Sequence, residues 1–449
     1  MSKSKSSHYQ DFTNLDQWLH YLEYLHSSEI DLGLSRIGIV TERLAIDLSF
    51  AKVITVAGTN GKGTTCAFIE NALFITENVL KEKAISEISA CQQGVAVYSS
   101  PHLEHFNERL RINKQDVSDQ ALIDAFKKIE VARGDISLSY YEYTTLAALL
   151  VLMVVKPRFI ILEVGLGGRL DATNIIDADI AVITTIDLDH QNFLGNDRES
   201  IGFEKAGIMR QGQDIVIGDI DVPKSVLAHA GSLHARQDEN LFIREQAFVV
   251  KEGKRQWQWQ TKQTRLTNLK PTYVPSDNVA TALMVLEKLN IPLTTAFVNE
   301  VISITKVAGR TELIKQAGHC DVILDVGHNP QATRYLSSYL KKIKTQSNYQ
   351  KIYAVVAMLE DKDISASLGS LKNDIDFWYT GALNVPRGAT SKIMNNKLIL
   401  FTDAINCFDN IGEAFKMANQ QASSSDLILV FGSFFTVANI RPQLITCSQ

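Results

Sequence analysis

A run of apolar, β-branched residues ends in a glycine-rich turn, and this junction constrains the fold more than any other feature. Residues 53–57 read VITVA, the turn reads GTNGKG at 58–63, and helix-forming residues follow Thr64. A strand, a glycine loop and a helix in this order aim backbone N–H groups at one point, which favours bound phosphate. Lys62 can reach the outer phosphates. The spacing departs from the usual P-loop, so an ordinary strand–helix connection stays open for this turn taken alone.

Short apolar runs alternate with amphipathic segments along the rest of the chain. The runs are almost continuously hydrophobic, which is typical of parallel strands covered on both faces. We therefore expect an α/β protein of two domains: an N-terminal P-loop ATPase-like domain with a mainly parallel sheet plus a small β-sheet, and a C-terminal Rossmann-like α/β domain. The expected domains are 1–305 and 306–449. The expected strands are 53–57, 95–98, 159–164, 180–185, 215–218, 322–326, 352–358, 377–380, 398–401 and 427–431.

Helices are expected between these strands. Alternating Trp and Gln after Gly253 predict a β-hairpin within 248–259, whose two tryptophans cover one face of a small sheet. The expected helices are 16–25, 64–74, 85–92, 119–132, 143–155, 277–289, 294–305, 332–342 and 412–421, with 77–92 as an added helical segment.

Composition excludes several classes of partner. The 449 residues carry a net charge of -5, which gives no general attraction to nucleic acid or to anionic membranes. The five cysteines are scattered without a Cys-x-x-Cys pair, as expected for thiols in a reducing compartment. No secretory signal is evident at residues 1–10, and the apolar stretch 146–155 is about half the length that spans a bilayer. We expect a cytoplasmic protein.

Acidic residues lie at the carboxyl ends of two expected strands, at the same edge of the sheet. Glu163 ends the apolar run that begins at Phe159, and Asp187, Asp189 and His190 follow the strand 180–185. Ligands collect at this edge of a parallel sheet, so a metal–phosphate site is the sharper interpretation. Local capping or an ion pair with Arg169 is the simpler one for Glu163. His102 and His105 invite a zinc interpretation, but no third ligand at sensible spacing supports it.

Several segments together resemble one enzyme family. Residues 57–64 (AGTNGKGT), 98–103 (YSSPHL), 106–109 (FNER) and 162–174 (LEVGLGGRLDATN) closely resemble folylpolyglutamate synthase/dihydrofolate synthase, the folate branch of the ATP-dependent Mur ligases. The segments 204–208, 325–330, 361–363, 386–389 and 431–434 extend the resemblance across nearly the whole chain.

The resemblance implies an amide ligase that activates a carboxylate with ATP as an acyl phosphate, which the amine of L-glutamate then attacks. It implies ATP, two Mg²⁺ sites and a monovalent cation as cofactors. The implied catalytic residues are Lys62, Glu163, His190 and Lys205. The implied metal ligands are Ser100, Glu163, His190 and Lys205, the last as a carbamate. The implied ATP contacts are Gly58, Thr59, Asn60, Gly61, Lys62, Gly63, Thr64, Asn278, Arg310, Asp325 and His328.

The segment Ser139-Tyr140-Tyr141-Glu142 and the turn Leu170-Asp171-Ala172 resemble the part of bifunctional members that binds dihydropteroate. Flat aromatic rings beside a carboxylate suit a pterin, but core packing of the tyrosines is an equal alternative. The resemblance favours addition of L-glutamate both to dihydropteroate and to reduced folates.

Three alternatives stay open: a monofunctional folylpolyglutamate synthase, a peptidoglycan-precursor ligase of the same superfamily, and a non-catalytic nucleotide-binding switch. The expected partners are small molecules, without nucleic acid or membrane, and the expected state is a monomer. The sequence departs from the family pattern at Ala308, where proline is common, and at Phe435, where histidine is frequent.

Overall fold

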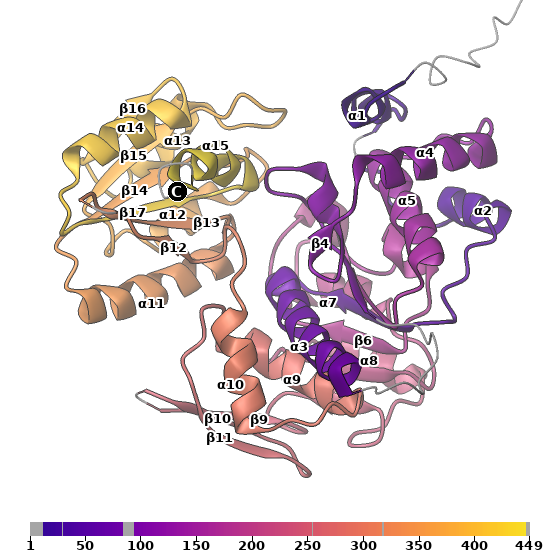
Figure 1. The fold of residues 1–449 in the computed structure, drawn as a ribbon. Coiled ribbons are helices and arrows are strands. Elements are labelled where there is room, and N and C mark those ends of the chain that lie inside the picture. The colour runs from indigo at the N-terminus through magenta and orange to yellow at the C-terminus, as the bar shows by residue number, and fades with distance from the viewer. Residues whose placement is uncertain (1–11, 29, 84–93, 254, 317, 446–449) are drawn as a thin grey trace, which may run out of the picture. The chain divides into compact units, whose positions relative to one another are not determined.

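The computed structural model describes residues 12–28, 30–83, 94–253, 255–316 and 318–445 (Figure 1). Its contacts divide the chain into two compact units. The first unit comprises residues 1–186, 194–271 and 276–304, and the second comprises 187–193, 272–275 and 305–449. The two short segments 187–193 and 272–275 therefore group with the C-terminal unit, although the chain around them belongs to the N-terminal unit.

The first unit is built on an eight-stranded sheet with the strand order β4-β3-β2-β5-β1-β6-β7-β8. Parallel pairing runs from β2 through to β8, and only the edge strands β3 and β4 are antiparallel. The strands are β1 (Lys52–Ala57), β2 (Val95–Tyr98), β3 (Leu110–Ile112), β4 (Gln115–Asp116), β5 (Phe159–Glu163), β6 (Ile180–Ile183), β7 (Asp214–Ile217) and β8 (Leu241–Ile243). The carboxyl ends of β1, β5 and β6 therefore meet at one edge.

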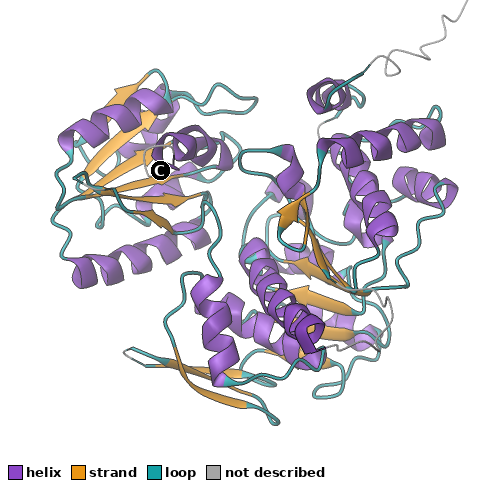
Figure 2. Cartoon of the chain, viewed as in Figure 1, coloured by secondary structure: helices purple, strands orange, loops and turns teal. Residues whose placement is uncertain are grey.

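Helices cover both faces of this sheet (Figure 2). The described helices that precede residue 305 are α1 (Leu15–Glu23), α2 (Ser35–Arg43), α3 (Lys62–Lys83), α4 (Asp119–Arg133), α5 (Tyr140–Val155), α6 (Gln191–Leu194), α7 (Arg198–Ala206), α8 (Lys224–Ser232), α9 (Ser276–Lys288) and α10 (Thr295–Ile304). Most of α6 groups with the second unit. The expected helix 85–92 lies outside the described residues, and residues 77–83 continue α3 without a break.

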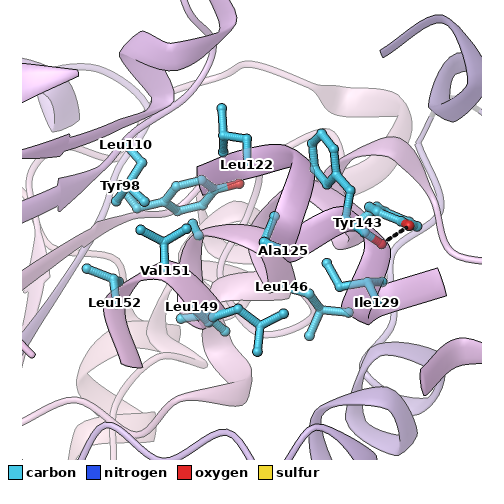
Figure 3. Close-up of a cluster of buried hydrophobic side chains, with 14 of the residues drawn as sticks. Tyr98, Leu110, Leu122, Ala125, Ile129, Tyr143, Leu146, Leu149, Val151 and Leu152 are labelled. Atoms are coloured by element: carbon cyan, nitrogen blue, oxygen red, sulfur yellow. Dashed lines mark hydrogen bonds between the residues drawn. The ribbon is translucent and has the colours of Figure 1, made fainter. Parts of the chain in front are cut away.

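A large buried cluster lies where α4 and α5 pack on the sheet. Figure 3 shows side chains of this cluster, among them Tyr98 of β2 and Tyr143 of α5, both almost completely buried. Apolar residues occur on every side of α5, as expected for a helix enclosed by α2, α4 and the sheet. This packing makes the region that carries Tyr140 and Tyr141 a rigid part of the unit.

A small antiparallel sheet has the order β11-β10-β9, with β9 (Val249–Glu252), β10 (Trp257–Gln260) and β11 (Arg265–Leu269). The hairpin expected around Gly253 is confirmed, and β11 adds a third strand. Trp257 and Trp259 are buried on one face of this sheet, as their alternation with Gln predicts.

The second unit has a six-stranded sheet with the order β12-β13-β17-β14-β15-β16, parallel except for β12. Its strands are β12 (Glu312–Ile314), β13 (Asp321–Asp325), β14 (Ile352–Val356), β15 (Phe377–Gly381), β16 (Ile405–Phe408) and β17 (Leu427–Phe431). Its helices are α11 (Pro330–Ser347), α12 (Ile364–Gly369), α13 (Ser391–Leu398), α14 (Ile411–Gln421) and α15 (Phe434–Ile445). The expected two-domain α/β fold class is thus confirmed.

The strand expected at 398–401 is wrong. Leu398 ends α13, and Ile399 and Leu400 are 58% and 68% exposed in the turn that follows. The strand at this place is β16, an edge strand whose half-exposed residues carry a weaker apolar signal. Among the residues that the structure describes, no helix is long and apolar enough to cross a membrane.

Candidate functional site

The glycine loop between β1 and α3 has a backbone that only glycine tolerates at two positions. Gly58 and Gly61 have φ values of +155° and +85°. A Cβ atom on Gly58 would lie 1.8 Å from Oγ1 of Thr184, and one on Gly61 would lie 2.4 Å from Oδ1 of Asn278. The loop therefore turns tightly against β6 and α9 and presents the N-terminus of α3, a favourable place for an anion.

Side chains and backbone groups hold this loop in shape. Lys62 Nζ donates to the carbonyl oxygen of Gly58 at 2.9 Å, which folds the side chain back over the loop. Thr64 Oγ1 donates to the Gly61 carbonyl oxygen at 3.0 Å, and Asn278 Nδ2 donates to Thr64 Oγ1 at 2.7 Å. Thr59 and Asn60 donate their N–H groups to Thr185 at 2.7 and 3.1 Å. The structure thus brings Asn278 to the candidate phosphate loop.

Glu163 lies beside the same loop. It is the last residue of β5, its exposed fraction is 6%, and β5 is paired with β1 so that Glu163 stands opposite Val56. Both carboxylate oxygens lie 3.7 Å from the place that a Cβ atom on Gly63 would take. Burial and the negative charge of Glu163 raise the pKa of the Cys66 thiol in α3, against the opposing charge of Lys62. A buried carboxylate and a lysine therefore flank the start of α3.

Lys205 is buried near the end of α7, with 3% of its surface exposed. The loop that follows Glu163 fixes this helix end. Arg169 donates its N–H to the carbonyl oxygen of Glu204 at 2.7 Å, and its guanidinium forms an ion pair with the Glu204 carboxylate at 2.9 Å. A Cβ atom on Gly168 would come within 3.0 Å of the Lys205 carbonyl oxygen. Arg169, considered above as a partner of Glu163, thus anchors the helix that carries Lys205.

Ser100, Tyr141 and Asp171 form a second group in the first unit. The Tyr141 hydroxyl donates to Oδ1 of Asp171 at 3.5 Å. Burial raises the pKa of Tyr141, and a hydrogen bond with the Ser100 side chain opposes the rise. Asp171 is 1% exposed and accepts hydrogen bonds from Leu166 and Thr173. Burial raises the pKa of Asp171, although these donors partly offset it. The structure therefore links the two segments that resemble a dihydropteroate site.

Ser139 and Glu142 have a structural task. Ser139 is the N-cap of α5, and its hydroxyl accepts from the Glu142 N–H at 3.3 Å, while the Glu142 carboxylate accepts from the Ser139 N–H at 2.7 Å. This reciprocal capping box satisfies N–H groups at the start of α5. Tyr140 instead packs against Arg109, whose guanidinium carbon lies 5.6 Å from the centre of the tyrosine ring.

Gly33 and Arg36, just before and within α2, contact this group, and no sequence motif indicates them. Arg36 forms ion pairs with Glu142 at 3.2 Å and with Asp31 at 2.7 Å. Gly33 donates its N–H to the carbonyl oxygen of Leu170 at 3.3 Å, and Ala172 nearby in sequence is buried. The contacts of Arg36 with Glu142 and of Gly33 with Leu170 join positions more than 100 residues apart. The available signal was a glycine between two leucines just before α2, which is weak alone.

His102 and His105 do not form a metal centre. Arg109 Nε donates to Nδ1 of His102 at 2.9 Å, and burial together with the Arg109 charge lowers the pKa of His102 to about 4. The His105 N–H donates to the Glu108 carboxylate at 2.7 Å. Within the described ranges, no group of three or more His, Cys, Asp or Glu side chains is arranged so that it could hold a metal ion.

In the second unit, Asp325 and His328 lie at the end of β13. Asp325 is 7% exposed and accepts the N–H groups of Thr311 at 2.8 Å and Gly327 at 2.7 Å. Burial raises the pKa of Asp325, and the charge of Arg310 opposes this. The guanidinium carbon of Arg310 lies 4.9 Å from the ring centre of Phe434. The residues of this unit that the resemblance implies as ATP contacts therefore lie close to one another.

His190 belongs to the short segment 187–193 of the second unit. Its φ is +51°, a left-handed conformation that is uncommon outside glycine. The preceding residue, Asp189, interacts with His328 at 3.6 Å and with Lys362 at 2.7 Å. The expected metal ligands thus divide between the units: Ser100, Glu163 and Lys205 lie in the first, and His190 lies in the second.

Two domain models match the chain. Residues 56–237 match the Mur ligase middle domain, and residues 309–434 match the Mur ligase glutamate ligase domain. The chain is 40% identical over 429 residues to dihydrofolate synthase/folylpolyglutamate synthase of Escherichia coli, covering 95% of this chain and 94% of the relative. It is 40% identical over 447 residues to the enzyme of the same name from Haemophilus influenzae, covering 94% and 96%.

Solved structures of proteins with these activities in their names also match the chain. A structure of E. coli FolC in complex with DHPP and ADP matches with a TM-score of 0.87 and 38% identity, covering 97% of this chain and 99% of that chain. A bifunctional folylpolyglutamate synthase/dihydrofolate synthase with Mn, AMPPNP and L-glutamate bound matches with a TM-score of 0.84 and 40% identity, covering 96% and 98%. The chain therefore belongs to the dihydrofolate synthase/folylpolyglutamate synthase family of Mur ligases.

Proposed function

We propose that this protein is an ATP-dependent ligase that joins L-glutamate to dihydropteroate, giving dihydrofolate, and to the γ-carboxyl group of reduced folates, giving folylpolyglutamates. The observation that carries the proposal is the glycine loop at the start of α3, with Lys62 on it and the buried Glu163 carboxylate beside Gly63. Relatives that align with about the whole chain and carry both activities in their name support it.

The loop residues Gly58 to Thr64 bind the triphosphate of ATP in this proposal. Their N–H groups and the N-terminus of α3 attract the phosphate oxygens. Lys62 leaves its bond to the Gly58 carbonyl and neutralises charge on the outer phosphates. Asn278 holds Thr64, so it keeps the last residue of the loop in place. Arg310, Asp325 and His328 add further contacts to ATP.

Mg²⁺ fits the donor set of the first unit. Glu163 offers a buried carboxylate and Ser100 a hydroxyl, and Mg²⁺ favours a site of one or two carboxylates completed by phosphate oxygens and water. When bound, Mg²⁺ offsets the charge that develops on the phosphoryl group during transfer. We propose Ser100 and Glu163 as ligands of one ion, and Glu163, His190 and Lys205 as ligands of a second.

Lys205 serves this purpose as a carbamate, which converts a cationic nitrogen into an anionic oxygen ligand. Its burial supports this step, since burial disfavours the ammonium and a neutral amine reacts with CO₂. The rigid attachment of α7 to the loop after Glu163 holds Lys205 in position. A monovalent cation near these groups is part of the same proposal.

The carboxylate substrate attacks the γ-phosphate of ATP and forms an acyl phosphate, with ADP as the leaving group. The amine of L-glutamate then displaces phosphate and forms the amide. We propose that residues 1–305 bind ATP and the pteroate substrate, and that 306–449 serve glutamate ligation. The pterin is held by the segment 139–142 with the turn 170–172, where Tyr140 and Tyr141 offer ring faces and Asp171 an acceptor.

The monofunctional synthase is the alternative enzyme. Measuring ATP-dependent incorporation of labelled L-glutamate with dihydropteroate and, separately, with a tetrahydrofolate substrate distinguishes the two. The proposal predicts incorporation with both. Incorporation with tetrahydrofolate alone would favour the monofunctional folylpolyglutamate synthase. ATP binding without ADP formation would favour the non-catalytic nucleotide-binding switch. We further propose a cytoplasmic location, supported by the free thiols of Cys66, Cys320 and Cys407, and a monomeric state.

A further inference from the structure

The segment 187–193 leaves the first unit and returns to it, yet it groups with the second unit. Its first flank is fixed: the Ile186 N–H donates to Oδ2 of Asp219 at 2.7 Å, and Arg198 Nε donates to the Ile186 carbonyl oxygen at 2.9 Å. Its other flank, Leu194, is buried in the core of the first unit. The chain therefore changes units directly after Ile186 and again before Leu194.

One buried carboxylate ties the segment to the second unit. Asp189 Oδ1 accepts the ammonium of Lys362 at 2.7 Å, and Oδ2 accepts Nδ2 of Asn329 at 2.9 Å. The side chains of Asp189 and Lys362 are only 8% and 7% exposed. Removing one partner of an ion pair so protected from water leaves the other charge buried without compensation, which is strongly unfavourable. A further contact, Arg334 with Asp187 at 2.8 Å, is more exposed.

The same carboxylate also holds the backbone of His190. Oδ1 of Asp189 accepts the His190 N–H at 2.8 Å, so one oxygen atom joins the Lys362 ammonium to the His190 backbone. His190 has a left-handed φ of +51° and begins the short turn in which the Phe193 N–H donates to the His190 carbonyl oxygen at 2.9 Å. A non-glycine residue keeps such a conformation only where its surroundings impose it.

We propose that Asp189 and Lys362 are positioning residues that attach His190 to the C-terminal unit, so that His190 is available as a metal ligand only while this attachment holds. The inference rests on the proposed function in one respect, the assignment of His190 as a ligand. The attachment itself stands on the contacts above.

The test uses the full-length protein and two readouts. The first is amide hydrogen exchange of the peptide covering 187–193 without ligand, which reports local opening. The second is the affinity of each Mn²⁺ ion in the presence of AMPPNP, measured by electron paramagnetic resonance. The variants are Lys362→Met, Lys362→Arg, Asp189→Asn and His190→Ala. Lys341→Met is the control, because Lys341 of α11 also pairs with an aspartate of the second unit, Asp374, but its own side chain is 66% exposed.

We expect Lys362→Met and Asp189→Asn to speed exchange of this peptide about tenfold or more and to weaken the second Mn²⁺ about 10- to 100-fold, the usual effect of removing a group that supports a metal ligand. The affinity of the first Mn²⁺ stays unchanged in these variants. Lys362→Arg keeps most of the parent protein's slow exchange and most of its affinity for the second Mn²⁺, and Lys341→Met changes neither the exchange nor that affinity. Asp189→Asn carries the test if Lys362→Met fails to fold.

Three results would overturn the inference. If Lys362→Met and Asp189→Asn leave exchange and the second Mn²⁺ unchanged while His190→Ala weakens that ion, the ligand assignment stands and the attachment is wrong. Loss of AMPPNP affinity with unchanged exchange would assign Lys362 to the nucleotide. If His190→Ala keeps both ions, the ligand assignment itself fails, and the inference fails with it.

Discussion

Asn278 Nδ2 donates a 2.7 Å hydrogen bond to Oγ1 of Thr64, which links the first turns of α9 and α3 across 214 residues of sequence. Asn278 is 5% exposed and also limits the space at Gly61. The nucleotide loop is therefore shaped by a helix far away in the sequence.

Asn278→Asp tests this link. The substitution keeps the size of the side chain but places a negative charge beside the expected triphosphate. We expect ADP affinity, measured by calorimetry, to fall about 10-fold or more, since a repulsion of 1.4 kcal/mol already gives a factor of 10. Asn278→Ala should weaken ADP less than Asn278→Asp. Equal ADP affinity in the parent protein, Asn278→Asp and Asn278→Ala would contradict a position of Asn278 beside the phosphates.

Lys205→Ala tests the carbamate. Without the anionic oxygen ligand, we expect the rate of ADP formation to fall about 100-fold, as for loss of a metal-supporting group. Formate supplies a small carboxylate and should restore part of the rate. Lys224→Ala, at the exposed start of α8, is the control and should keep full activity with or without formate. Unchanged turnover in Lys205→Ala would end the carbamate proposal.

Tyr141→Phe and Tyr143→Phe separate substrate binding from stability. The Tyr141 hydroxyl lies 3.5 Å from Asp171 in the expected pterin region, and its loss should raise the KM for dihydropteroate about fivefold to tenfold. Tyr143 donates to the Phe126 carbonyl oxygen at 2.9 Å inside the core, so Tyr143→Phe should lower the free energy of unfolding by about 1–3 kcal/mol and leave this KM unchanged. An unchanged KM with Tyr141→Phe and a raised KM with Tyr143→Phe would place the pterin away from Tyr141.

His102 gives the protein a pH dependence of stability. Its pKa is about 4 in the folded protein, against 6.5 for an exposed histidine. The unfolded chain therefore binds more protons between these values, and folding stability contributed by neutral His102 is lost as the pH falls from 6.5 towards 4. His102→Gln, which still offers an oxygen to Arg109, should show a shallower fall of Tm over this range. His20→Gln, 74% exposed, should follow the parent protein.

The positions of the buried strands along the chain could be predicted because their signal is local. The runs ending at Ala57 and Glu163 are buried on both faces and read as continuous apolar stretches. The run at 398–401 looks similar in composition, but α13 extends to Leu398, and the ring of Phe401 approaches the backbone of Gly369 instead of joining the sheet. Composition alone does not distinguish a helix end with an apolar turn from a short strand.

The candidate site was predictable only where a motif carries it. The glycine loop, Glu163 and Lys205 stand in distinctive segments, whereas the bond of Asp189 to Lys362 joins residues 173 positions apart and leaves no local pattern. At Ser139 and Glu142 the sequence carries a second signal. Their spacing of three is also that of a capping box, which they form at the start of α5, and their expected place beside the pterin stays a prediction.

The acyl phosphate is the central claim, and transfer of oxygen tests it most directly. Dihydropteroate labelled with ¹⁸O in its carboxylate is incubated with ATP and L-glutamate, and the inorganic phosphate is analysed by mass spectrometry. An acyl phosphate requires one carboxylate oxygen to leave with the phosphate, so one ¹⁸O should appear in phosphate for each dihydrofolate formed. Dihydrofolate formation with unlabelled phosphate would contradict the mechanism, and ATP binding without dihydrofolate would contradict the function.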